Sequence, residues 1–341
     1  MLASSSVNET SEKSPTHPIQ SWGSRIFKGA LVIAIFYFLW SKGLFSLEAT
    51  AAALSQPRMI LPPILVIFSL TLLGTLRWQI LLGAQGIRIP YLRTLQINMI
   101  GNFFNTALPG AVSGDFVKAF YIGNDIPGRR GNAFGSILFD RILGLCALVL
   151  VATASLWINW NELRNSDVLP IIRATLTTGA FGVIGFFGYL FLVPRHKDPL
   201  EKILIRLASW KPKAASLLRI FEGVRAYQKE RSAVLIALLI SLVIHTLVSW
   251  SAIQFLRALG DFDTASSTLY VFMPLTMLVT AVPVLPGGIG TGHAALSWGL
   301  QAVGSARGAD VFNLFFLTNL AISLLGSVVY LLHPKKPPIN G

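Results

Sequence analysis

Long runs of apolar residues, separated by short polar segments, dominate the pattern of the chain. Six of these runs are about 20 residues or longer and carry few charges, which is typical of helices that cross a membrane. They occupy 28–47, 60–82, 133–158, 168–193, 233–257 and 310–332. The pattern therefore predicts an all-α, polytopic membrane helix bundle with about six full spans.

Two further apolar regions, 94–122 and 264–303, are interrupted by proline and glycine. The first contains "FFNTALPGAVSGDF" and the second contains "AVPVLPGGIGTGHAAL". Non-helical backbone at membrane depth has to be covered by protein or water. Each interruption is therefore expected to mark either a re-entrant hairpin or a broken single crossing.

The length of the arms favours hairpins. The segment 94–108 has 15 residues, or roughly 22 Å at about 1.5 Å per residue, which falls short of a hydrocarbon core of about 30 Å. Proline suits the first position of a helix, where its missing N–H costs nothing. We therefore expect two re-entrant helical hairpins, with return arms that start at Pro109 and Pro286.

Charge supports the same topology. If each broken region makes an even number of crossings and the N-terminus is cytoplasmic, the inside segments hold 18 of the 28 Lys and Arg residues and the outside loops hold four. Cytoplasmic loops carry an excess of Lys and Arg. A single crossing at 94–122 would move the most basic segment, 194–232, to the outside and violate that rule.

This topology contains an internal repeat. The spans 60–82 and 133–158 flank the first hairpin, and 233–257 and 310–332 flank the second. The first unit starts outside and the second starts inside, so the two form an inverted repeat of the kind many transporters use. The N- and C-termini are both predicted to be cytoplasmic.

The remaining segments divide the chain. Residues 1–24 are rich in Ser, Thr and Pro and predict a disordered cytoplasmic tail. Residues 25–333 are expected to form a single transmembrane domain, followed by a short C-terminal tail, 334–341. Within the domain, 194–232 mixes ten basic residues with regularly spaced apolar ones. It predicts amphipathic helices on the cytoplasmic membrane surface, or alternatively a solvated connecting loop.

Composition narrows the class of protein. The chain is 53% hydrophobic and 13% charged, with a net charge of +13. In so apolar a chain this charge indicates contact with anionic lipid rather than nucleic acid. The single cysteine, Cys146, forms no intramolecular disulfide, and no Cys/His spacing suggests a metal site. No catalytic or nucleotide-binding motif occurs, so we expect neither an enzyme nor a cofactor.

The hairpin tips are the first candidate site. Helix N-termini present free N–H groups and partial positive charge, so two of them near the midplane would form a site for an anion such as a phosphate headgroup. Alternatively, the prolines and glycines only make the turns and permit close helix packing. The candidates at the tips are Pro109, Gly110, Gly114, Pro286, Gly287, Gly288 and Gly290.

Polar and charged side chains in apolar segments are the second group of candidates, because such residues are costly in a membrane. Asp115 is expected to meet Lys118 three residues on. Asp140 is expected to meet Arg77 or Lys118, and Arg141 to meet a phosphate or a carboxylate. Purely structural ion pairs are the alternative. Two uncharged candidates complete the set, Asn105 before the first break and His293 after the second.

Four motifs in this order resemble a known family: "LRWQILLGAQGI", "NMIGNFFNTALPGAVSGDFVKAFYIG", "GSILFDRILGL" and "PVLPGGIGTGHAAL". The chain resembles the lysylphosphatidylglycerol synthase transmembrane region, also called the flippase-like or UPF0104-type family, over roughly 25–330. Ser113 stands where members often have glycine, and His293 where many have glutamate, so a second acidic site is in doubt.

The resemblance implies an integral inner-membrane protein. In fused relatives this region translocates an aminoacylated phospholipid between leaflets, but lysyl transfer itself is not expected of this chain. We therefore expect a translocator of a phospholipid or other lipid-linked substrate that binds an anionic headgroup. The alternatives are a non-catalytic scaffold for a lipid-modifying enzyme partner and a secondary transporter of a small anion.

Overall fold

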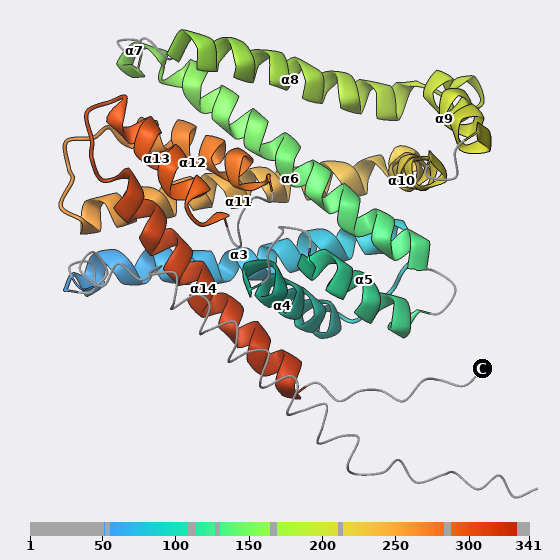
Figure 1. Cartoon of the computed structure of the whole chain (residues 1–341), viewed down its shortest axis with the longest axis horizontal. Helices are drawn as coiled ribbons and strands as arrows, with labels where there is room; N and C mark the ends of the chain where they lie inside the picture. The colour runs from blue at the N-terminus through green and yellow to red at the C-terminus, as the bar shows by residue number, and fades with distance from the viewer. Residues whose placement is uncertain are drawn as a thin grey trace, which may run out of the picture. The chain divides into compact units, whose positions relative to one another are not determined.

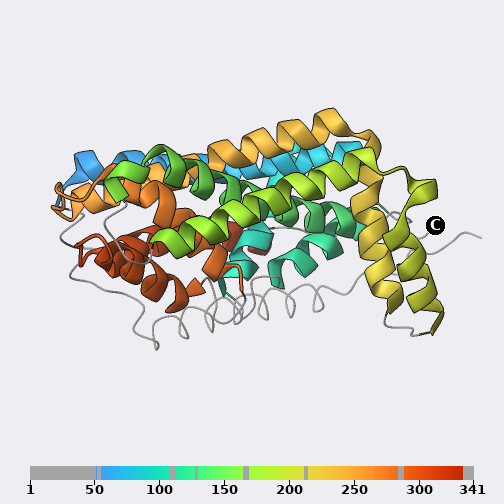
Figure 2. The same ribbon diagram turned by 90° about the horizontal axis from the view of Figure 1, so that it is seen from above.

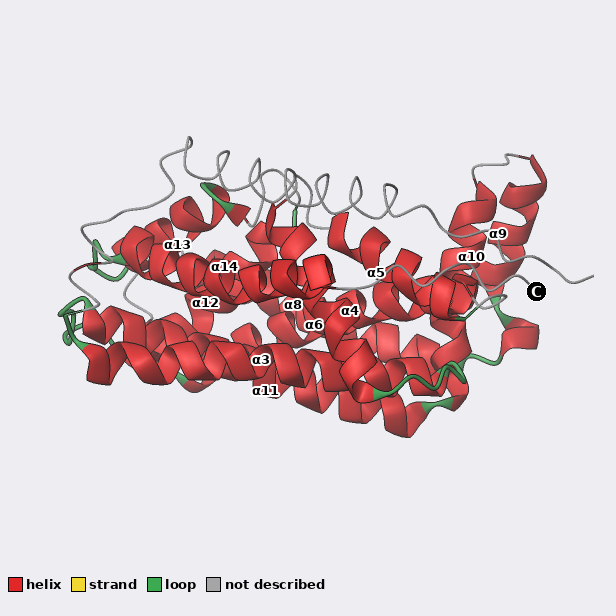
Figure 3. Ribbon diagram, turned by 90° about the horizontal axis from the view of Figure 1, so that it is seen from below, coloured by secondary structure: helices red, strands yellow, loops and turns green. Residues whose placement is uncertain are grey.

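The computed structural model describes residues 51, 55–107, 113–126, 130–163, 169–210, 214–282 and 288–332. The chain divides into two compact units, Met1–Lys42 and Gly43–Gly341, and every described residue belongs to the second. The expected tails, the span at 28–47 and both proline-containing tips lie outside the described residues. Within the described part, all regular structure is helical (Figure 3).

Five long apolar helices account for the other expected spans, and their bounds agree with the predicted ones to within three residues. Each is long and apolar enough to cross a membrane. They are α3 (Pro57–Ala84), α6 (Arg130–Ile158), α8 (Leu169–Leu192), α11 (Arg231–Ala258) and α14 (Gly308–Leu332). The one-turn helix α7 (Trp160–Leu163) lies between α6 and α8.

Both broken regions form pairs of shorter helices that lie side by side (Figure 1). The first pair is α4 (Tyr91–Ala107) with α5 (Ser113–Asp125), and the second is α12 (Ser266–Thr280) with α13 (Thr291–Gln301). All four are shorter than the roughly 20 residues that a spanning helix needs. A helical hairpin therefore stands at each of the two predicted places.

The helix of the second return arm begins after a glycine turn. Helix α13 begins at Thr291, with Gly290 as its N-cap at φ 75°. Such a left-handed backbone favours glycine, whereas the proline ring holds φ near −65°. Gly290 makes the turn into α13, whereas Pro286, the expected start of the arm, lies outside the described residues.

The contacts between helices repeat in matched pairs. Helix α3 packs along α11, its counterpart in the second repeat. Helix α14 packs against α4, and the counterpart contact joins α6 to α12. The hairpin contacts of α5 with α6 and of α13 with α14 correspond in the same way. Reciprocal contacts of this kind are what two-fold symmetry produces.

The repeats are inverted relative to each other. Helices α3 and α11 lie alongside and run in opposite directions in both Figure 1 and Figure 2. Helices α6 and α14 also run in opposite directions, and the two hairpins approach the middle of the bundle from opposite ends (Figure 1). Helix α8 packs on α6 and belongs to neither repeat.

The basic segment folds into helices at one end of the bundle. It contains η1 (Arg195–Lys197), α9 (Pro199–Trp210), α10 (Ala214–Arg225) and η2 (Ala226–Lys229). Helices α9 and α10 pack on each other and lie across the direction of the long helices (Figure 2). No residue of α9 is buried, so its apolar side chains are available to a membrane surface or a partner.

Arg225 of α10 anchors this segment to the C-terminal end of α8. Arg225 Nε lies 3.0 Å from Asp198 Oδ2, and both side chains are buried. The Arg225 guanidinium also donates to the carbonyl oxygens of Leu190 and Val193, at 3.0 and 2.6 Å. A cation at the C-terminal end of a helix satisfies its last carbonyl groups and complements its dipole.

The Asp198 carboxylate is held ionised by its neighbours. Burial by itself raises the pKa of this carboxyl group. The hydrogen bond from the Tyr189 hydroxyl, two backbone N–H groups and the Arg225 guanidinium outweigh burial, so the pKa lies below its usual value. Asp198 and Arg225 therefore form an ion pair at neutral pH.

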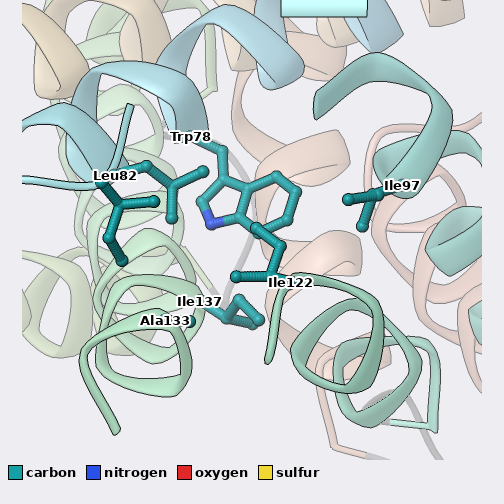
Figure 4. Close-up of a cluster of buried hydrophobic side chains, with 7 residues drawn as sticks. Trp78, Leu82, Ile97, Ile122, Ala133 and Ile137 are labelled. Atoms are coloured by element: carbon teal, nitrogen blue, oxygen red, sulfur yellow. The ribbon is translucent and has the colours of Figure 1, made fainter. Parts of the chain in front are cut away.

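The first repeat is packed around an apolar cluster that joins α3, α4, α5 and α6 (Figure 4). Trp78 lies among its members, is 2% exposed, and donates from its indole N–H to the Ser136 hydroxyl at 3.2 Å. The other labelled members are Leu82, Ile97, Ile122, Ala133 and Ile137. This packing fixes the helices that carry the charged side chains described below.

Candidate functional site

Arg77 of α3 and Asp140 of α6 form a two-bond ion pair inside the bundle. Arg77 Nε and Nη2 donate to the two Asp140 carboxylate oxygens at 2.7 and 2.8 Å. Arg77 Nη1 also donates to the Ser241 hydroxyl of α11 at 2.9 Å. The side chains are 13% and 16% exposed. Asp140 thus meets Arg77, one of its two expected partners, and Arg77 joins three long helices.

Asp115 of α5 is paired with Arg141 of α6. Arg141 Nε and Nη2 donate to the Asp115 carboxylate at 2.8 and 3.1 Å. The expectation that Asp115 meets Lys118 is wrong, because Arg141 reaches both of its oxygens. Arg141 meets a carboxylate, as expected. Its side chain is 42% exposed while that of Asp115 is 5% exposed, so the pair lies at the edge of the buried region.

Lys118 lies between these two pairs and is 9% exposed. Its Nζ lies 5.4 Å from the centre of the Trp78 ring, a cation–π arrangement. Within the described ranges, no carboxylate lies at ion-pair distance and no hydrogen bond reaches the ammonium group. Lys118 is therefore a largely buried cation that forms no ion pair within those residues, although the Asp115 and Asp140 carboxylates lie close enough to attract it.

Glycine on α4 makes room for this side chain. A Cβ atom at Gly101 would lie 2.4 Å from Lys118 Cε. A Cβ atom at Gly114 would lie 1.9 Å from the Gly101 carbonyl oxygen. The two glycines therefore let α4 and α5 approach closely enough to bury the lysine between them.

The charged groups form one cluster, which we call the Lys118 cluster. Its members are Arg77, Asp115, Lys118, Asp140 and Arg141. Three carry a positive charge and two a negative charge, so the formal balance is +1. Buried charges are stable when they are paired, and an anion at Lys118 would complete the pairing here.

The first hairpin tip uses one of its backbone donors internally. The Gly114 N–H donates to Asn105 Oδ1 of α4 at 2.8 Å. Asp115 stands in the first turn of α5, where a carboxylate complements the helix dipole. Pro109 and Gly110 lie outside the described residues. The described start of α5 is thus already partnered, and the excess positive charge comes from Lys118.

The candidate residues of the second hairpin do not belong to the Lys118 cluster; they contact α12 and α14. A Cβ atom at Gly288 would lie 2.6 Å from the Thr280 side chain of α12. His293 packs edge-to-face on Phe312 of α14, with ring centres 4.8 Å apart. The Gly290 N–H donates to His293 Nδ1 at 3.4 Å, a capping contact. Pro286 and Gly287 lie outside the described residues.

A neutral polar cavity of about 250 Å³ lies on another side of α4. Its lining comes from α3, α4 and α14 and is rich in amide and hydroxyl groups. The lining residues are Thr71, Met99, Asn102, Asn105, Thr106, Asn319, Ile322 and Ser323. The sequence indicated Asn102, Asn105 and Thr106 as residues that could line a polar cleft, but Asn319 and Ser323 were missed. Both are polar residues in an apolar span, which is the signal that singled out Asp115.

The described residues offer no candidate metal site. Across the described ranges, no group of three or more His, Cys, Asp or Glu side chains is placed to hold a metal ion. Arginine or lysine contacts each carboxylate of the Lys118 cluster or lies close to it. The arrangement is suited to holding an anion rather than a cation.

One protein family matches most of the chain. The family model described as the lysylphosphatidylglycerol synthase transmembrane region matches residues 26–326. The chain belongs to this family. It is an integral membrane protein of the lysylphosphatidylglycerol synthase transmembrane region family, as the four sequence motifs indicated.

Two curated members of the family are similar to this chain over much of their length. A UPF0104 membrane protein of Pyrococcus horikoshii is 26% identical over 331 residues, covering 89% of this chain and 95% of the relative. A UPF0104 membrane protein of Methanothermobacter thermautotrophicus is 24% identical over 254 residues, covering 69% and 73%. No solved structure matches the chain.

Proposed function

We propose that this protein translocates a lipid with an anionic headgroup between the leaflets of the inner membrane. The single observation that carries the proposal is Lys118, a largely buried lysine that forms no ion pair or hydrogen bond with the described residues and gives its charged cluster one excess positive charge. A lipid phosphate supplies the missing charge. Membership of the lysylphosphatidylglycerol synthase transmembrane region family supports a lipid as the source of that phosphate.

The electrostatics favour an anion over a neutral headgroup. Removing an ammonium ion from water is costly unless it is paired and hydrogen-bonded. Phosphate oxygens accept several charge-assisted hydrogen bonds. Asp115 compensates Lys118 only in part, because its carboxylate is shared with Arg141. A headgroup at Lys118 is therefore stabilised by a charge that the protein has already buried.

Arg141 provides a second contact for the headgroup. Its side chain is 42% exposed, so a phosphate at Lys118 has access to the outer edge of the guanidinium. Arginine matches phosphate geometry through two parallel N–H donors. The headgroup thus competes with Asp115 for Arg141, and this competition releases the headgroup again.

Orientation follows from charge. The basic helices α9 and α10, the ends of α3 and α5 and the start of α6 lie at one end of the bundle (Figure 1). The positive-inside rule makes that end cytoplasmic. Both chain termini are then cytoplasmic and the hairpin α4–α5 is re-entrant from the cytoplasm. Cysteines at positions 128 and 210 in a Cys146→Ala background should react with a membrane-impermeant reagent only from the cytoplasmic side.

The test is a transfer assay with the full chain in phosphatidylcholine liposomes that carry a trace of headgroup-accessible, fluorescent phosphatidylglycerol. Dithionite added outside quenches the outer leaflet, so protein-dependent loss of the inner pool measures transfer. Lys118→Gln should slow transfer by at least about tenfold, because a hydrogen bond to a charged group contributes about 1.5–3 kcal/mol. Lys118→Arg keeps the charge and should retain more activity.

Matched measurements separate the alternatives. Arg173→Gln changes a basic residue of α8 that stacks over Trp160, 4.1 Å from the ring centre and outside the Lys118 cluster, and should leave transfer unchanged. Uptake of free inorganic phosphate without lipid transfer would indicate a small-anion transporter. A chain that transfers neither substrate but copurifies with a lipid-modifying enzyme would support a scaffold.

A further inference from the structure

An apolar groove of about 490 Å³ runs between α3 and α14. Its residues are almost all hydrophobic and come from the N-terminal half of α3, from α14 and from one position of α11. They are Ile60, Ile64, Leu65, Phe68, Phe255, Leu314, Leu317, Thr318, Ala321, Ile322 and Leu325. The large side chains of Leu65, Phe68 and Leu325 are exposed, so the groove opens on the surface of the bundle.

The groove adjoins the neutral polar cavity, because Ile322 lines both. Helix α3 gives their order. Thr71 lines the cavity and Phe68, one turn earlier, lines the groove. Arg77 of the Lys118 cluster stands six residues after Thr71, or roughly 9 Å along the helix at about 1.5 Å per residue. Charged cluster, polar cavity and apolar groove therefore follow one another along α3.

The cavity can hydrogen-bond an uncharged group. Its lining includes three asparagines, two threonines and a serine and contains no charged residue. The hydroxyls of Thr106 and Ser323 donate to carbonyl groups of their own helices, while the Asn102 amide forms no hydrogen bond with the described residues. At about 30 Å³ per water molecule of liquid, 250 Å³ holds several small polar groups.

We propose that the cavity and the groove together bind one membrane glycerolipid, with its hydroxyl and ester region against Asn102 and Asn319 and an acyl chain along the groove. An ester region joined directly to an acyl chain has the same sequence of polar and apolar parts as the cavity and the groove. The site deepens the proposed function and rests on it: it lies beyond the Lys118 cluster on the path of the lipid.

A protein partner fits this surface poorly. Helices α3 and α14 are both long, apolar candidate spans, so the groove between them lies at membrane depth, where lipid chains are the available apolar ligand. One segment of the same chain is the competing occupant. Residues 28–47, which are apolar and lie outside the described residues, are therefore included in the test.

The test fills the groove. Ala321 lines the groove and is exposed, so Ala321→Trp adds bulk there without entering the packed core. Ala174→Trp makes the same change on α8, at an exposed position away from the groove. The full chain is purified in detergent with palmitoyl-oleoyl phosphatidylglycerol, and retained lipid is counted by native mass spectrometry.

Wild type and Ala174→Trp should each retain one lipid molecule, whereas Ala321→Trp should bind it about tenfold more weakly. Excluding about two methylene groups from an apolar site has an effect of that size. Asn102→Leu should also weaken retention. Equal retention by Ala321→Trp and Ala174→Trp, or no retained lipid in wild type, would overturn the proposal.

Two further measurements identify the occupant and separate this site from the Lys118 cluster. A photo-reactive phenylalanine at position 68 should form an adduct with the lipid, and an adduct with a peptide from 28–47 would overturn the proposal. Lys118→Gln should abolish the preference for phosphatidylglycerol over phosphatidylcholine but leave one lipid retained. Loss of transfer with retention intact thus refutes the proposed function alone, and the reverse refutes the groove alone.

Discussion

Asp115 and Arg141 hold α5 against α6 through two charge-assisted hydrogen bonds, and Asp115 forms its ion pair with Arg141 rather than with Lys118. Asp115 and Lys118 both belong to α5 and are three positions apart, a spacing that places them on the same side of the helix. Arg141 thus controls whether the Lys118 charge is available to a ligand.

Arg141→Gln should therefore weaken anion binding at Lys118 without unfolding the protein. With Arg141 gone, the buried Asp115 carboxylate turns to Lys118 and neutralises it. Binding of phosphatidylglycerol should fall by about tenfold or more, as when one charge-assisted contact is lost. The double variant Arg141→Gln with Asp115→Asn should recover much of the binding, because Lys118 is free again. Equal binding by the single and double variants would contradict the expectation that Asp115 turns from Arg141 to Lys118.

Asp140→Asn should destabilise the bundle strongly. It leaves the Arg77 guanidinium, 13% exposed, without its counter-ion, and breaking a buried pair by removing one partner costs about 3–5 kcal/mol. The matched control is Asp310→Asn. Asp310 pairs at 3.5 Å with Arg307, whose side chain is 51% exposed, and such surface pairs contribute about 0–1 kcal/mol. Thermal unfolding in detergent should rank wild type and Asp310→Asn well above Asp140→Asn.

Gly326→Ala should loosen the contact between α14 and α4. A Cβ atom there would lie 2.1 Å from the Met99 carbonyl oxygen, a backbone atom that cannot move aside. At Gly182 of α8 nothing lies within 4 Å of the added carbon, so Gly182→Ala should be neutral or stabilising by up to about 1 kcal/mol. The midpoints of thermal unfolding for the two variants test this difference, and a fall for both would indicate a helix effect unrelated to packing.

Acid should release α9 and α10 from α8. The pKa of Asp198 is lower in the folded chain than its usual value. Its contribution to stability is therefore fully present above the unfolded-state pKa of about 3.9 and is lost as the pH falls through the folded-state pKa. Amide exchange within 199–225, corrected for intrinsic rates, should rise at low pH. Asp198→Asn should show fast exchange already at pH 7 and little further change in acid.

The sequence predicted the long helices well because their signal is local. Apolar runs of about 20 residues can be read directly from the chain, and α3, α6, α8, α11 and α14 follow them closely. The two interruptions were visible for the same reason, since proline and glycine disfavour helix wherever they occur. The glycine turn at Gly290 was harder to place, because several glycines in this stretch can adopt a positive φ.

The sequence predicted the ion pairs less well than the long helices. The pair of Asp140 and Arg77 could be proposed because the apolar segments contain few other charged residues that either could pair with. Asp115 with Arg141 could not be chosen over Asp115 with Lys118, because the choice depends on how α5 lies against α6. The polar cavity was visible only in part, since Asn102 could be selected from the sequence but Thr71 and Asn319 come from two other helices.

The reciprocal helix contacts carry information about a second state of this protein. In an inverted repeat, each half displays a shape that the other half can adopt. Were the two halves to exchange shapes, the space among α3, α4 and α14 would close and its counterpart among α11, α12 and α6 would open toward the opposite side. One structure thereby contains a template for the outward- or inward-facing alternative, and cross-links that close the space between α4 and α14 should trap it.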